Sequence, residues 1–193
     1  MSIVFLSILI ILLVIGTMIA IIGTKLMKKL HPGELGVVVG PSENDPMSIT
    51  LDGYKVYTSP VFAGRAPNFI PLNKLYKMDI RPLELDFFVD QVSTHDDRQF
   101  AITAEATVHF DIEPDNLHRP IEMFLGRPRN EVASVATKII ASNLRSVVAH
   151  LSSDRLDAAL PAISENALQS AEPDLANLGL LPQSVSIRRA TRI

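Results

Sequence analysis

The chain has 193 residues, a formal net charge of −3 and no cysteine. A small negative charge gives no basic footprint, so nucleic acid is not an expected partner. The lack of cysteine excludes disulfides, cysteine-ligated zinc, thiol nucleophiles and S-palmitoylation.

The first uncharged stretch predicts a transmembrane helix. From Ile3 to Ile22 the chain reads IVFLSILIILLVIGTMIAII, and no ionisable side chain occurs before Lys25. About 20 helical residues span the ~30 Å hydrocarbon core of a bilayer. A secretory signal peptide is disfavoured because no basic residue precedes this long stretch. We therefore expect residues 1–24 to form a membrane anchor whose lipid contacts include Ile3, Phe5, Leu9, Leu12, Ile15, Ile19 and Ile22.

Three lysines directly after this stretch predict its orientation. Lys25, Lys28 and Lys29 follow it, whereas only the terminal amine precedes it. The positive-inside rule then places the N-terminus outside and the rest of the chain in the cytoplasm. We expect residues 25–34 to form a basic juxtamembrane linker whose lysines contact anionic lipid headgroups. This predicts a single-pass membrane protein.

Residues 35–112 are predicted to be rich in strands. Residues 35–40 form an apolar run between turn signals, and residues 47–51 and 54–58 flank Asp52-Gly53, a pair favoured in tight hairpins. Three prolines in residues 59–71 predict a loop or a sheet edge there.

The strongest strand signal is the strict alternation of apolar and polar residues over 99–112. A period of two indicates a strand with one buried and one solvated face. A polar turn at residues 95–98 separates it from the apolar segment 83–94, so we expect the two to pair antiparallel.

Residues 113–193 are predicted to be rich in helices. We expect a short helix over 115–125 that stops at Gly126, and a long helix from an N-cap at Asn130 to Leu151 with one apolar stripe. A further helix follows from Ser153, with a kink at Pro161 and a stop at Asn177-Leu178-Gly179. Val185 and Ile187 then alternate as a closing strand. Strands followed by helices, with one returning strand, indicate an α+β fold.

The sequence contains no catalytic signature that we recognise. His95, Asp96 and Asp97 could hold a metal through imidazole and carboxylates. Three polar residues between two apolar strands are more typical of a solvated hairpin turn. We therefore expect no catalytic residue, no cofactor and no metal site.

The order of these elements resembles the SPFH or band 7 (prohibitin homology) domain, and most closely its bacterial flotillin-like branch. The segments that carry the resemblance are spread over residues 31–190: Pro32–Gly40, Phe124–Gly126, Leu144–Val148, Leu151–Ser153 and Leu178–Leu180. The resemblance implies a curved, mostly antiparallel sheet with packed helices in two subdomains over residues 35–193, with a strand-rich part over 35–112 and a helix-rich part over 113–193. It also implies a non-enzymatic role. The Ala/Glu-rich coiled coil that usually follows this domain does not appear in the sequence.

Two functions are compatible with this resemblance, and a third lies outside it. Flotillin-like proteins form large membrane-bound oligomers that scaffold lipid and protein microdomains, which makes an oligomerising scaffold the leading interpretation. The alternative is a regulatory partner of a membrane protease or channel, as prohibitin-like and stomatin-like relatives are. A membrane-tethered enzyme with an unrecognised site is a third hypothesis. The expected partners are membrane lipids, further copies of the chain and other membrane proteins.

One surface is predicted to make a second membrane contact. Val61, Phe62, Phe69 and Ile70 are more apolar than a solvated loop requires, and they follow the anchor closely. The alternative is that these side chains fill the core of the sheet.

A second surface is predicted to mediate assembly. The side of the long helix opposite its apolar stripe is rich in small residues and includes Ser134, Lys138, Ala141 and Arg145. Small side chains let another copy approach closely, and copies confined to one membrane need only modest affinity. The alternative is a plain solvent-exposed face.

Overall fold

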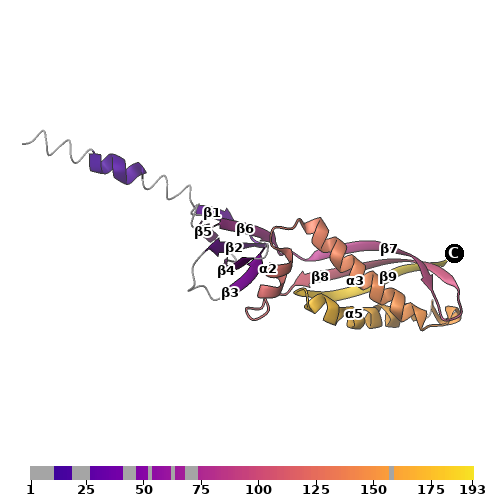
Figure 1. Ribbon diagram of the computed structural model, residues 1–193. Coiled ribbons are helices and arrows are strands. Elements are labelled where there is room, and N and C mark those ends of the chain that lie inside the picture. The colour runs from indigo at the N-terminus through magenta and orange to yellow at the C-terminus, as the bar shows by residue number, and fades with distance from the viewer. Residues whose placement is uncertain are drawn as a thin grey trace, which may run out of the picture. The chain divides into compact units, whose positions relative to one another are not determined.

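The computed structural model describes residues 11–18, 27–40, 47–51, 54–61, 64–67, 74–156 and 159–193. These residues form a mixed α+β structure (Figure 1). The chain divides into two compact units, Met1–Lys77 and Met78–Ile193. The sequence predicted a boundary at residue 112 between a strand-rich and a helix-rich part. The observed division comes earlier, after Lys77, because the long strands that follow it pack on the helices of the second unit.

The first unit is built from short strands. Strand β1 (Met27–Leu30) pairs antiparallel with β5 (Gly64–Pro67), and a four-stranded sheet has the order β3-β4-β2-β6. The strands of that sheet are β2 (Glu34–Gly40), β3 (Met47–Leu51), β4 (Tyr54–Val61) and β6 (Lys74–Asp79). The predicted hairpin is confirmed, because β3 and β4 pair antiparallel from Met47 opposite Thr58 to Leu51 opposite Tyr54. Buried Leu30, Val38 and Leu75 form a small apolar cluster.

The sheet-edge alternative predicted for residues 59–71 is confirmed where the structure describes that segment, because it contains the end of β4 and the strand β5 of a two-stranded sheet. Strand β4 continues to Val61, and Pro60 lies opposite Val37 of β2. Among the described residues the pairing of β3 with β4 ends at Thr58, so β2 is the strand neighbour of Pro60 that the structure shows. A proline is tolerated there because it need not donate a hydrogen bond to a second neighbour.

The second unit is a three-stranded antiparallel sheet covered on one face by helices. Its order is β7 (Leu83–Ser93), β8 (Gln99–Phe110) and β9 (Leu180–Arg192). The predicted antiparallel pairing is confirmed, and buried residues alternate with exposed or half-buried ones along β7 and β8. The predicted alternation is wrong at residues 111–112, because β8 ends at Phe110: Asp111 is 4% exposed and Ile112 is 47% exposed. Helix α3 (Arg129–Ala149) packs on β7 and on α5 (Leu160–Ala176), and α5 packs on β9 (Figure 1). The buried core includes Leu83, Ile102, Ile140, Leu144, Ile163, Leu175 and Leu180.

The helices differ from the predicted ones mainly at their ends. The short helix is α2 (His118–Phe124), and α3 begins at Arg129 after Pro128, so the predicted N-cap at Asn130 is wrong. The helix predicted from Ser153 is two helices, α4 (Ser153–Leu156) and α5. Pro161 lies in the first turn of α5, where proline fits a helix without kinking it.

Glycines with positive φ end two helical segments. Gly126 follows α2 with φ of 80°, and Gly179 precedes β9 with φ of 73°. Both positions were predicted helix stops, and this backbone conformation favours glycine because it has no Cβ. Within the described part of the chain, one helix, α3, is long and apolar enough to cross a membrane. Its apolar residues pack in the core of the second unit.

Candidate membrane-facing and assembly surfaces

The described part of the apolar N-terminal stretch is helical. Residues 11–18 form a helix whose large apolar side chains are between 49% and 68% exposed: Ile11, Leu12, Leu13, Val14, Ile15 and Met18. This segment has no charged side chain to turn toward water, and the hydroxyl of Thr17 donates to the Val14 carbonyl within the helix. Leu12 and Ile15 of the predicted anchor lie in it; the other predicted contacts lie outside the described residues: Ile3, Phe5, Leu9, Ile19 and Ile22.

Part of the predicted basic linker is a strand. Lys28 and Lys29 belong to β1, and Lys25 lies outside the described residues. The side chain of Lys29 is exposed, while its backbone carbonyl accepts a hydrogen bond of 2.8 Å from Lys77 Nζ. The headgroup contact of these lysines stays a prediction.

The carboxylate of Glu34, at the start of β2, connects two strands of the first unit. Glu34 Oε2 accepts hydrogen bonds of 3.0 Å from the backbone N–H of His31 and from Lys77 Nζ. The His31 backbone N–H and the Lys77 ammonium together lower the pKa of Glu34 to about 2. Glu34 therefore stays ionised at neutral pH and links β2 to β6.

The predicted second membrane contact falls mostly outside the described residues. Val61 is the last residue of β4, whereas Phe62, Phe69 and Ile70 lie outside the described part of the chain. The membrane contact of these four residues stays a prediction.

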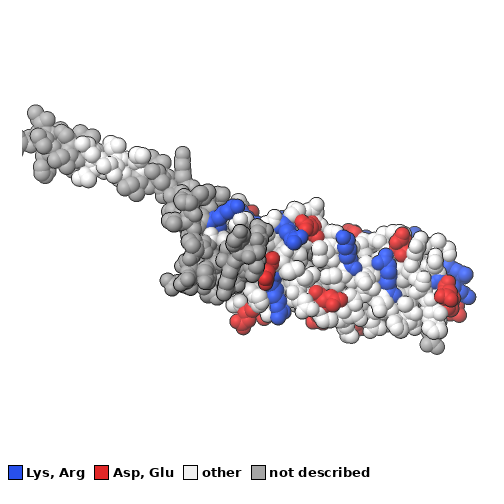
Figure 2. Space-filling view, in the orientation of Figure 1, with Lys and Arg blue, Asp and Glu red and all other residues white. Residues whose placement is uncertain are grey.

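The predicted assembly face on α3 is only partly exposed. Ser134, Lys138 and Arg145 are exposed, but Ala141 is 9% exposed and belongs to the core. The prediction that Ala141 lies on the outer side is wrong, because α3 packs on both β7 and α5 and so buries a wider stripe than a sheet alone would require. Figure 2 shows a mostly uncharged surface over α3 and α5 with scattered charges of both signs. Arg145 of α3 lies 3.8 Å from Asp90 of β7.

A carboxylate cluster fixes the segment before β7 to the start of α3. Asp79 pairs with Arg81 at 2.5 Å and with Arg129 at 3.3 Å. Arg129 also donates to the backbone carbonyls of Arg81 and Pro82. Hydrogen bonds from Arg81 are the main reason why the pKa of Asp79 is lowered to about 2.

The turn between β7 and β8 is tied to the start of α4. Asp96 accepts hydrogen bonds from the backbone N–H and the hydroxyl of Ser153, at 3.0 and 2.5 Å, and from the Thr94 hydroxyl at 2.7 Å. The Ser153 hydroxyl is the main cause that holds the pKa of Asp96 well below its usual range. His95 donates its backbone N–H to the Leu151 carbonyl. The predicted hairpin turn thus also holds the segment between α3 and α4 in place through hydrogen bonds.

No group of three or more histidine and carboxylate side chains is placed to hold a metal ion within the described residues. The three candidates considered from sequence do not converge there, because Asp96 is turned toward Ser153 and His95 is held through its backbone.

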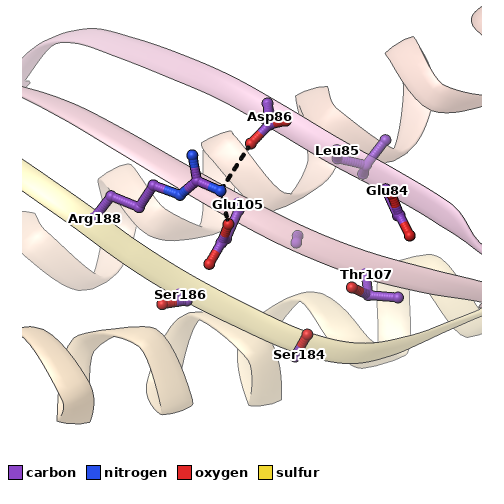
Figure 3. Close-up of a pocket in the computed structure, with 9 residues that line it drawn as sticks. Glu84, Leu85, Asp86, Glu105, Thr107, Ser184, Ser186 and Arg188 are labelled. Carbon is purple, nitrogen blue, oxygen red and sulfur yellow. Dashed lines mark hydrogen bonds and ion pairs between the residues drawn. The ribbon is translucent and has the colours of Figure 1, made fainter.

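The face of the three-stranded sheet that the helices do not cover, here called the open face, was not predicted as a site. It carries a shallow depression of about 320 Å³. Two rows of residues line it, and within each row the residues are direct neighbours on adjacent strands. One row is Glu84, Thr107 and Ser184; the next is Asp86, Glu105 and Ser186. The helices lie behind the sheet and these side chains point away from them (Figure 3).

Arg188 neutralises two carboxylates on this face. Asp86 and Glu105 lie directly opposite each other on β7 and β8, an arrangement that is unfavourable between like charges. The Arg188 guanidinium donates to Glu105 and lies 3.7 Å from Asp86 (Figure 3). Glu105 and then Asp86 raise the pKa of Arg188. Arg188 continues the period-two alternation of Ser184 and Ser186 on this face, opposite buried Val185 and Ile187, and the register irregularity of β9 follows Ile187.

Comparison with known proteins places this fold in a family. Residues 28–191 match the family described as SPFH domain / Band 7, and the chain belongs to that family. It is similar to flotillin-1 of Carassius auratus, at 24% identity over 160 residues, and to flotillin-1 of Homo sapiens and of Mus musculus, each at 22% over 158 residues. Each match covers 81% of the chain and 34% of the relative, so the chain spans about a third of these proteins. The resemblance to flotillin-like SPFH proteins is confirmed.

Proposed function

We propose that the protein is a membrane-anchored, oligomerising scaffold that organises membrane microdomains from the cytoplasmic face. The observation that carries this proposal is an exposed, uncharged and mostly apolar helical segment at residues 11–18, together with an SPFH domain over residues 28–191. Such a segment is stable in hydrocarbon, where its backbone groups are paired within the helix. The domain after it is then kept at the membrane surface.

The orientation follows from charge. Exposed Lys29 and its sequence neighbours Lys25 and Lys28 follow the apolar stretch, and the positive-inside rule assigns that side to the cytoplasm. The same lysines are attracted to anionic headgroups by about 1 kcal/mol each near the surface.

We further propose that the role involves no chemical reaction. The three carboxylates with clearly lowered pKa values are each bound to neighbouring elements: Glu34 to Lys77, Asp79 to Arg81 and Arg129, and Asp96 to Ser153. A general base needs a pKa close to the working pH, whereas these groups are shifted away from it. Their arrangement supports a structural use.

Crosslinking of the full chain in native membranes tests the scaffold role. We expect oligomers much larger than a dimer, together with a cytoplasmic signal from a reporter fused after Ile193. A chain that stays monomeric at native abundance would contradict the scaffold. If the chain instead crosslinks in a fixed ratio to one membrane protease or channel, with little self-association, the regulatory alternative replaces it.

A further inference from the structure

The two outer strands of the three-stranded sheet carry opposite charges. Strand β7 contains three acidic residues and no basic one, and β9 contains three basic residues and no acidic one. The acidic residues are Glu84, Asp86 and Asp90; the basic ones are Arg188, Arg189 and Arg192. Since β8 lies between β7 and β9, one lateral half of the sheet, along β7, is acidic and the other, along β9, is basic. We call these halves the β7 side and the β9 side.

A large aromatic ring lies in the acidic row. Phe88 is 65% exposed and lies on the open face between Asp86 and Asp90. Its cross-strand neighbour is Thr103, and the neighbour of Thr103 on β9 is Arg189. An exposed phenyl ring beside carboxylates suits a guanidinium group, which stacks on the ring and pairs with the acids.

The arginines of β9 have different partners. Arg188 is used within the sheet by Glu105 and Asp86. Arg189 and Arg192 are exposed, and neither has an ion pair among the described residues.

Asp90 has an ion pair of 3.8 Å with Arg145, but its side chain is 67% exposed, and such a surface pair contributes little to stability and can be exchanged. The sheet therefore offers a guanidinium without an ion pair among the described residues and, across β8, an exposed aromatic and acidic site that fits one.

We propose that the β9 side of this sheet in one copy docks on the β7 side in a second copy, with Arg189 of one copy seated on Phe88 and Asp90 of the other. This inference rests on the proposed function in that it names the contact by which the scaffold assembles. Arg and aromatic residues are the types that most often dominate binding energy at interfaces.

The charge pattern favours a second copy as the occupant. Copies inserted in one membrane in the same direction are related by an axis normal to that membrane, and a ring of them needs two different, complementary patches. The acidic β7 side and the basic β9 side are such a pair. Confinement to two dimensions raises the effective concentration of neighbouring copies.

Charge reversal with complementation tests this contact in full-length protein in native membranes. One variant, Arg189→Glu with Arg192→Glu, makes both sides acidic; the other, Glu84→Lys with Asp90→Lys, makes both sides basic. Two differently tagged copies are coexpressed, and their co-purification after mild solubilisation is measured. Glu165→Lys with Glu172→Lys on exposed positions of α5 is the control of matched charge change.

We expect each variant to lose at least about tenfold in self-co-purification, and the two variants mixed together to recover it. Phe88→Ala should lose a similar amount, while circular dichroism stays unchanged because the ring is 65% exposed. The control should assemble as the original chain does.

The experiment separates failure of the docking contact from failure of the scaffold role. If the variants assemble normally, or if mixing them restores nothing, the docking of β9 on β7 is wrong while the scaffold role stands. If the original chain does not co-purify with itself in native membranes, both the docking and the oligomeric scaffold are wrong.

Discussion

The hydroxyl of Ser164 on α5 accepts a hydrogen bond of 3.2 Å from the backbone N–H of Ile187 on β9, and donates one of 2.9 Å to the Leu160 carbonyl. Ser164 is 8% exposed, one of a few buried polar residues. Because β9 is an outer strand, this amide would otherwise lack a partner inside the protein. The helix thus occupies part of the strand edge and discourages pairing with another strand there.

Ser164→Ala should destabilise the chain by about 1–3 kcal/mol, because a buried N–H loses its acceptor. Chemical unfolding of the full chain in detergent, followed by circular dichroism, measures the change. Ser170→Ala on the exposed side of the same helix is the control and should be close to neutral. Equal effects of the two substitutions would show that the Ser164 contact contributes nothing.

Gly179→Ala should be among the most damaging single changes. A Cβ there would lie 2.5 Å from the Pro120 backbone nitrogen and closer still to its Cδ, and φ is 73°. Gly126→Ala is a matched control, because φ is 80° but no atom lies within 4 Å of the added Cβ. We expect the control to cost about 1–2 kcal/mol and Gly179→Ala clearly more, measured by the same unfolding assay. A similar cost for both would mean that the approach to Pro120 is not tight.

Asp96→Asn should remove a pH-dependent part of the stability. The pKa of Asp96 is held below its usual value of about 4 mainly by the Ser153 hydroxyl, so its stabilisation is complete above that pH and disappears as the pH falls below it. The difference in unfolding free energy between the original chain and the variant should be largest at neutral pH and should shrink below about pH 4. A difference that does not change with pH would contradict this role.

Much of the second unit was predictable because its signals are local. Strict alternation over residues 99–112 gave β8, and the polar turn before it gave the pairing with β7. The apolar stripe of α3 and the glycine stops at Gly126 and Gly179 follow from helix periodicity and backbone sterics. These features depend on residues that are neighbours in the sequence.

The features that were missed depend on distant contacts. Ser153 is 57 residues from Asp96, so its hydrogen bond could not be inferred from the turn sequence. The burial of Ala141 depends on where α5 packs, and the ion pairs of Arg188 depend on the register in which β9 and β7 pair with β8. Residues 59–71 were predicted as a loop or a sheet edge, and the sequence did not show that β4 continues through Pro60, because the register of the sheet sets where strands end.

Substitutions on α3 separate its exposed face from its buried one. Ser134→Glu with Ser142→Glu changes exposed positions and should leave circular dichroism unchanged; if this face mediates assembly, the oligomers become smaller in native electrophoresis. Ala141→Glu places a charge in the core and should unfold the unit instead. A folded Ala141→Glu variant would contradict the burial of this residue. Oligomers of unchanged size for the double serine variant would exclude the predicted assembly face of Ser134, Lys138 and Arg145.

Deletion of residues 1–24 tests membrane anchoring most directly. Membranes carrying the full chain or the shortened chain are extracted with alkaline carbonate, and the protein is followed in the pellet and the supernatant. We expect the full chain to stay in the pellet and the shortened chain to be released, because the exposed apolar helix at residues 11–18 is part of the only segment proposed to span the bilayer. Retention of the shortened chain in the pellet would contradict the single-anchor account, and release of the full chain would contradict membrane insertion itself.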